Sequence, residues 1–205
     1  EGRRPGVEGA VEEWPVDEAY SIHDLEEKLS EMLVKCSRVF VKLGVDDSVD
    51  KIVEHEVKRN SRDRQKFGTG PMSIVDPSPL VNELRLRKSE SEIALMRHSA
   101  KIASQAHIQA MSNTKPGVGE WQLEGIIEGL FKYCNTDGIS YPCIIGSGEN
   151  ATILHYNVNN DTCNDGEVIL IDAGCEFDGY ASDITRSWPV NGKFTPEQAE
   201  IYNIV

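Results

Sequence analysis

The chain has 205 residues, of which 39% are hydrophobic and 27% are charged, and 21 basic against 34 acidic residues give a formal net charge of −13 at pH 7. This composition is typical of one or two globular domains with a real core, and the negative charge argues against nucleic acid or an anionic membrane surface as the main partner. No apolar run approaches the roughly 18 residues of a membrane-spanning helix. The 5 cysteines include no CxxC pair, which predicts reduced thiols and neither a disulfide framework nor a zinc ribbon.

The first part of the chain predicts the end of a small α/β domain. Residues 1 to about 20 are rich in Gly, Pro and Glu, and we expect an irregular segment there. Ser21 precedes apolar residues at helical spacing and is expected to cap a helix. The alternation in Arg38–Leu43 predicts a strand, and a polar helix is expected over Ser48–Lys58. We place the boundary of this domain between residues 79 and 80.

The second part predicts two helices followed by strands, an α+β layout. Ser89 and Glu92 have the spacing of a capping box before a long amphipathic helix, and a second helix over Glu120–Tyr133 is expected to bury Trp121 among other apolar residues. Four strands of an antiparallel sheet are then predicted: Ile139–Ile145, Thr152–Tyr156, Glu167–Gly174 and Tyr180–Pro189. A tight hairpin at 146–150 is expected to join the first two of them.

Two aspartates are predicted to share one face of this sheet. Asp178-Gly179 between apolar arms is a strong signal for a two-residue hairpin turn. That turn places Asp172 opposite Thr185 and Asp183 opposite Gly174. Because strand side chains alternate between faces, Asp172 and Asp183 become diagonal neighbours, about 7–8 Å apart.

A carboxylate inside the apolar run Val168–Ala173 is costly unless something neutralises its charge. For a single aspartate, backbone donors or Arg186 would be the simpler partner. Two aspartates on one face favour divalent cations, and such carboxylate sites suit Mn²⁺, Co²⁺ or Zn²⁺ as a hydrolytic pair.

Three segments resemble a known family, the pita-bread metallopeptidases, and within it the Xaa-Pro aminopeptidase branch. They are Leu170–Gly174, Gly179–Arg186 and Pro189–Phe194. The resemblance is strong over residues 80–205 and weaker before them. It implies that 80–205 are the first half of a pita-bread catalytic domain, preceded in 1–79 by the C-terminal part of a small non-catalytic α/β domain.

The resemblance also implies roles for individual residues. The family binds two metal ions through two Asp, one His and two Glu, and Asp172 and Asp183 match the Asp pair. The other three ligands, including a Glu that handles the proton, belong to a second half, so these 205 residues are expected to be a partial domain that is inactive alone. His155 matches a catalytic histidine that contacts the substrate, and Tyr141 is expected to line the substrate pocket. A satisfied core histidine and a packed sheet tyrosine are the alternatives for these two positions.

The function implied by the resemblance is release of an N-terminal residue from peptides with proline in second position. It further implies two divalent ions, most often Mn²⁺ with Co²⁺ or Zn²⁺ as alternatives, peptide substrates, a homodimer as the full-length protein, and a mitochondrial or cytoplasmic location. Two other hypotheses remain open at this point: a non-catalytic interaction module or truncated isoform, and a metal-free hydrolase of the creatinase type. Retention of both aspartates disfavours the latter.

Overall fold

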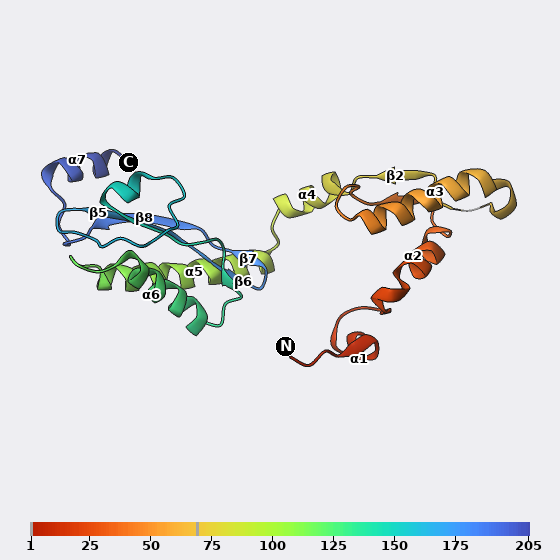
Figure 1. Cartoon of the computed structure of the whole chain (residues 1–205), viewed down its shortest axis with the longest axis horizontal. Coiled ribbons are helices and arrows are strands. Elements are labelled where there is room, and N and C mark those ends of the chain that lie inside the picture. The colour runs from red at the N-terminus through yellow and green to blue at the C-terminus, as the bar shows by residue number, and fades with distance from the viewer. Residues whose placement is uncertain (1, 69) are drawn as a thin grey trace. The chain divides into compact units, whose positions relative to one another are not determined.

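The chain separates into two compact units, Glu1–Arg87 and Lys88–Val205 (Figure 1). The structure is a computed structural model, and it describes residues 2–68 and 70–205, apart from the side chains at 63–65 and 67. In the described part, no helix combines the length and the apolar character that a bilayer crossing requires. The assignment of residues 1–79 to a non-catalytic domain of the family remains a prediction.

The first unit is built around two parallel strands. Strand β1 (Arg38–Phe40) pairs with β2 (Ser73–Val75), and α3 (Asp47–Phe67) connects them. Parallel strands require such a crossover, since a hairpin cannot join strands that run in the same direction. The predicted α/β character is confirmed, although the strand is shorter than predicted and the helix expected over Ser48–Lys58 is longer.

Further helices precede and follow this pair of strands. Helix α1 (Gly6–Glu13) lies within the segment predicted to be irregular, so that prediction is wrong for these eight residues. Three of them are Val or Ala and three are Glu, and these residues tolerate a helix despite the glycines. Ser21 caps the short 3-10 helix η1 (Ile22–Asp24) with its hydroxyl, and η1 leads into α2 (Leu25–Leu33). Helix α4 (Ser78–Leu86) ends the unit.

The second unit begins with α5 (Glu90–Asn113) and α6 (Glu120–Tyr133), both as predicted. The capping box of α5 is complete, because the Glu92 N–H donates to Ser89 Oγ at 3.4 Å and the Ser89 N–H donates to Glu92 Oε2 at 2.6 Å. These bonds, the one from the Ser89 backbone first among them, lower the pKa of Glu92 to about 2. Trp121 is 51% exposed and not buried as predicted, since its ring packs against the glycine that caps α6.

Two three-stranded antiparallel sheets follow, with the strand orders β4-β5-β8 and β3-β6-β7. Helix α7 (Pro196–Ile204) comes after the last strand. The strands are β3 (Gly138–Ile139), β4 (Ile144–Ser147), β5 (Val168–Ala173), β6 (Cys175–Phe177), β7 (Tyr180–Ala181) and β8 (Ile184–Pro189).

Three of the strand predictions are corrected by this arrangement. The segments Ile139–Ile145 and Tyr180–Pro189 are each divided between the two sheets, and no hairpin joins the first of them to a strand at Thr152–Tyr156. A 3-10 helix, η2 (Gly148–Thr152), stands in place of that hairpin. The physical reason is that the Ser147 N–H donates to the carboxylate of Glu120, at 2.9 Å, and not to a neighbouring strand.

The predicted hairpin register is confirmed. Asp178 and Gly179 have φ angles of 50° and 76°, as a two-residue turn of the favoured kind requires, and Phe177 pairs with Tyr180. Further along the same register, Asp172 stands opposite Thr185. The turn therefore sets which side chains of the two arms share a face.

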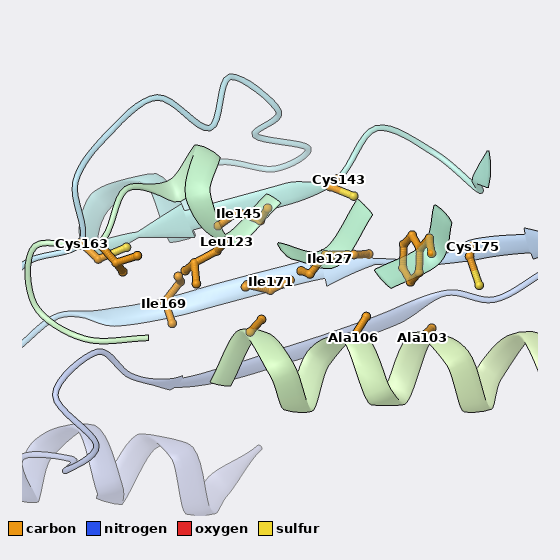
Figure 2. Packing of buried hydrophobic residues seen from close by; sticks show 14 of the residues in the cluster. Ala103, Ala106, Leu123, Ile127, Cys143, Ile145, Cys163, Ile169, Ile171 and Cys175 are labelled. Atoms are coloured by element: carbon orange, nitrogen blue, oxygen red, sulfur yellow. The ribbon is translucent and has the colours of Figure 1, made fainter. Parts of the chain in front are cut away.

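Helices α5 and α6 cover one face of the sheet β4-β5-β8 (Figure 1). Ile169 and Ile171 of β5 point into the core with 0% exposure, and Figure 2 shows them among small residues of α5 and larger residues of α6. The labelled core side chains from the helices are Ala103, Ala106, Leu123 and Ile127. Because strand side chains alternate, Asp172 and its neighbours at even positions of β5 lie on the opposite face, away from this core.

Candidate metal and substrate site

A cleft of about 320 Å³ lies on the sheet face that bears Asp172. It brings together the four side chains to which the sequence assigned roles, although they come from separate elements. Asp172 belongs to β5, Asp183 to the short link between β7 and β8, Tyr141 to the link between β3 and β4, and His155 to the loop after η2. The full lining is Tyr141, Pro142, Ile144, His155, Asn157, Asp172 and Asp183.

The two aspartates converge on one phenol. The Tyr141 hydroxyl lies 2.5 Å from Asp172 Oδ1 and 3.0 Å from Asp183 Oδ1. Both carboxylates are thus within reach of a group placed between them. Burial first, and then hydrogen bonding to Asp172, raises the pKa of Tyr141 well above its usual range, so the phenol keeps its proton and is the donor.

This arrangement has too few hydrogens for its acceptors. A phenol has a single O–H, which can be donated to only one of the two carboxylates at a time. Arg186, the alternative partner considered from the sequence, donates from Nη1 to the Thr185 carbonyl at 2.6 Å. The carboxylate oxygens of Asp172 and Asp183 therefore carry negative charge that neither Tyr141 nor Arg186 neutralises. Such oxygen ligands suit divalent cations of the Mn²⁺ type.

The aspartate pair is not by itself a complete metal-binding group. Among the described residues, no group of three or more His, Cys, Asp or Glu side chains is placed to hold a metal ion. Asp172 and Asp183 are therefore candidate ligands that need additional donors. A binuclear metal site is a proposal that rests on this pair.

His155 lies on a loop and not on the strand predicted for it. Its backbone has a φ of 58°, in the left-handed region, and its side chain is exposed at the cleft. The core-histidine alternative is therefore wrong for this residue. The next residue, Tyr156, is the one that is buried.

Sequence reasoning missed three residues of the lining. Pro142 and Ile144 form an apolar wall beside Tyr141, and Asn157 lies two positions after His155. The position of Ile144 could have been found from strand pairing, because it is opposite Asp172 in the sheet. Asn157 has no such signal, since its loop has no periodic pattern.

A larger hollow of about 1150 Å³ lies between the outer face of β5 and β8 and helix α7. Its lining includes Leu170, Phe194 and Ile201, and it does not include Asp172 or Asp183. The chemistry of the carboxylate pair therefore points to the smaller cleft as the site.

Gly174 keeps the backbone that carries Asp183 close to β5. A Cβ at this position would lie 1.8 Å from the Ser182 carbonyl oxygen, which is backbone and cannot turn aside. We expect Gly174→Ala to displace Asp183, to weaken metal binding, and to lower the free energy of unfolding by about 1–3 kcal/mol or more. Denaturant titration and metal titration measure the two effects.

The matched control for this substitution is Gly129→Ala in α6. A Cβ there meets nothing within 4 Å, so the added methyl should leave metal binding unchanged and stabilise the helix by roughly 0.5–1 kcal/mol. Equal behaviour of the Gly174 and Gly129 variants would contradict the role given to Gly174.

Comparisons with known proteins show which family the chain resembles. The sequence model of metallopeptidase family M24 matches residues 94–205. The Xaa-Pro aminopeptidase of Escherichia coli K12 is 42% identical over 204 residues, which are all of this chain and 46% of that protein. Human Xaa-Pro aminopeptidase 3 is 34% identical over 213 residues, and the mitochondrial intermediate cleaving peptidase 55 of Arabidopsis thaliana is 36% identical over 205, each match covering all of this chain and 40% of the relative.

The solved structures give the same result. E. coli aminopeptidase P in its low-pH form superposes with a TM-score of 0.92 at 42% identity, covering all of this chain and 46% of that one. The zinc-substituted form of the E. coli enzyme in complex with product has a TM-score of 0.91 with the same coverage. The chain thus spans less than half the length of these relatives.

Proposed function

The chain belongs to metallopeptidase family M24, and from this premise we propose that the protein is a metal-dependent aminopeptidase that removes the N-terminal residue from peptides with proline in second position. The observation that carries the proposal is the convergence of Asp172 and Asp183 on the Tyr141 hydroxyl in a cleft that His155 also lines. The names of the similar curated proteins, which include Xaa-Pro aminopeptidases, support this choice of reaction.

Asp172 and Asp183 would hold the metal ions in this proposal. Bound divalent ions supply charge that polarises the scissile carbonyl and makes water a better nucleophile. We propose Mn²⁺, with Co²⁺ or Zn²⁺ as alternatives, because carboxylate oxygens suit such ions. Tyr141 holds the carboxylates in place through its hydroxyl, and its ring forms one wall of the substrate pocket.

Proline in second position sets a specific demand on the cleft. The imide nitrogen has no N–H to donate, and the ring restricts the residue before it, which excludes such bonds from many peptidases. Pro142 and Ile144 supply an apolar wall that suits a pyrrolidine ring. His155 lines the same cleft and is the polar side chain that would contact the substrate.

Finer assignments belong to the same proposal. Within the branch we propose Xaa-Pro aminopeptidase 3, although the identity to the E. coli enzyme is higher than to the human protein of that name. We propose residues 1–79 as the end of a non-catalytic domain and 80–205 as the first half of the catalytic domain. A homodimer and a mitochondrial location, with the cytoplasm as an alternative, complete the proposal, and the mitochondrial relative supports the first location.

The test uses the protein expressed from its complete coding sequence. We expect it to cleave a Xaa-Pro peptide, to leave the matched Xaa-Ala peptide nearly intact, to lose activity with a chelator, and to regain it with Mn²⁺. Cleavage that persists after complete metal removal would favour the metal-free creatinase-type hydrolase. Absence of cleavage under all metal conditions would favour a non-catalytic module.

His155→Ala should separate catalysis from metal binding in this full-length protein. Because His155 is proposed to contact the substrate and not the ions, we expect metal content to stay constant while kcat falls roughly 10²-fold, the scale of a lost acid–base or positioning group. The matched control is His98→Ala, an exposed histidine of α5 whose ring contacts Phe177. The assignment would be contradicted if the His155 variant lost its metal, or if its turnover equalled that of the wild type.

A further inference from the structure

The loop that carries His155 is held by a buried carboxylate. After η2, residues 153–161 form no helix and no strand, yet His155 must keep one position at the cleft to act on a substrate. Glu120 lies beneath this loop with 0% exposure, at the first position of α6. A negative charge at a helix N-terminus is electrostatically favourable, which lowers the cost of burying it.

Glu120 accepts four hydrogen bonds from the segment that surrounds His155. At Oε1 the donors are the Ser147 N–H at 2.9 Å and Asn150 Nδ2 at 3.2 Å. At Oε2 they are the Tyr156 hydroxyl at 2.8 Å and the Asp161 N–H at 3.0 Å. A carboxylate has about four acceptor sites, so this side chain is fully satisfied.

These four donors lie on both sides of His155 in the sequence. Tyr156 is adjacent to His155, and its phenol is buried against Glu120. Burial, and then the hydrogen bond to Glu120, raise the pKa of Tyr156, so its hydroxyl remains a donor. The Glu120 N–H also donates to the Asp161 carbonyl at 2.9 Å, which closes a reciprocal pair at the end of the loop. One side chain thus fixes the start, the middle and the end of the segment.

Asn159 is a second anchor of the same loop. It is 1% exposed, accepts from the Ile145 N–H at 2.9 Å and donates to the Cys143 carbonyl at 2.8 Å. Asn159 therefore keeps the loop attached to β4 when the contacts of Glu120 change. Loss of Glu120 should loosen the part near His155 without releasing the whole segment.

We propose that Glu120 is a positioning residue for the reaction: its buried carboxylate binds Ser147, Asn150, Tyr156 and Asp161 and thereby fixes His155 at the cleft. The inference rests on the proposed function, because it assumes that His155 acts on a substrate. Glu120 itself does not line the cleft and touches no candidate metal ligand.

The requirement is for a carboxylate and not only for a polar side chain. All four partners are donors, and glutamine would replace one acceptor oxygen with an NH₂ group. If the NH₂ group took the place of Oε2, the Tyr156 hydroxyl could rotate and accept a hydrogen bond from it. The Asp161 N–H can only donate, so it would lose its acceptor. Glu120→Gln is therefore expected to keep the helix and lose part of the clamp.

The first experiment compares Glu120→Gln with wild type in the full-length, metal-loaded protein. We expect kcat to fall roughly tenfold to hundredfold, the scale of a reacting group displaced by about an ångström, with a smaller change in KM and unchanged metal content. Hydrogen exchange should become faster in peptides covering residues 147–161. The matched control is Glu128→Gln, which removes a carboxylate from the same helix about two turns further on and should keep wild-type values in all readouts.

A double-mutant cycle with His155→Ala tests whether Glu120 acts through His155. If it does, Glu120→Gln lowers kcat in the wild-type background and hardly lowers it further once His155 is absent. Effects that multiply, or a Glu120→Gln variant with wild-type kcat and exchange, would overturn the inference. If Glu120→Gln does not fold, Tyr156→Phe decides the question, because it removes one donor and leaves the carboxylate in place; a lower kcat with coupling to His155 supports the inference and wild-type kcat overturns it.

Failure of the proposed function has a different signature from failure of this inference. In the first case the wild-type protein itself does not cleave Xaa-Pro peptides. In the second case the wild type is active and Glu120→Gln is as active.

Discussion

Replacing either Asp172 or Asp183 with asparagine should remove metal binding and nearly all turnover from the full-length protein. Asparagine keeps the shape of the side chain and removes the negative charge that would neutralise a cation. Loss of several kcal/mol of charge stabilisation in the transition state corresponds to a decrease in kcat/KM on the order of 10³-fold or more. Both variants should behave alike, because the two carboxylates contact the same hydroxyl and face the same cleft.

The same substitutions should raise the stability of the metal-free protein, although they abolish its activity. Without a cation, two carboxylates compete for the one proton of Tyr141, so removing a charge should relieve that conflict. We expect a higher midpoint of thermal unfolding for Asp172→Asn measured with a chelator present. A gain in stability together with a loss of activity is the pattern of residues kept for function.

Asp178→Asn is the matched control for both measurements. It makes the same chemical change in the same hairpin, at an exposed turn position whose φ of 50° asparagine adopts readily. Metal content and kcat/KM should match the wild type. The assignment of Asp172 and Asp183 as ligands would be wrong if their variants bound two ions and turned over like this control.

The relation between the two aspartates could be predicted from the sequence because it depends on local rules. Asp178-Gly179 fixes the turn, and the two-residue period of a strand then decides which side chains share a face. The structure confirms the pairing of Asp172 with Thr185, and both aspartates line one cleft. A hairpin contains nearly all the information needed for this part of the site.

The loop after η2 could not be predicted in the same way. The run Thr152–Tyr156 has the β-branched and apolar residues of a strand, but its neighbours bond to Glu120, whose donors lie 27 to 41 positions away in the sequence. Hydrogen bonds between such distant residues leave no periodic pattern. Tyr141 is a similar case, because its contact with both aspartates depends on the break between β3 and β4, which belong to different sheets.

The 205-residue chain alone should not hydrolyse Xaa-Pro peptides. Asp172 and Asp183 are the only carboxylates of the described chain in the cleft lining, and two such groups are too few to hold two divalent ions, each of which needs several ligands and an ordered outer shell. The similar proteins are more than twice as long as the matched region, which gives room for further ligands. We therefore expect metal binding by this chain to be weak.

The experiment compares the purified 205-residue chain with the full-length protein on the same Xaa-Pro peptide in excess Mn²⁺. Calorimetry should show tight binding of two ions to the full-length protein and only weak binding to the shorter chain, whose turnover should stay at background. Circular dichroism and a cooperative unfolding transition are needed beside the assay, because they distinguish an incomplete site from an unfolded chain. Adding Asp172→Asn to the shorter chain should then abolish even the weak binding, since that binding depends on the carboxylate pair. Tight binding of two ions with turnover near the full-length value would show that the described residues form a complete site, and would overturn this expectation.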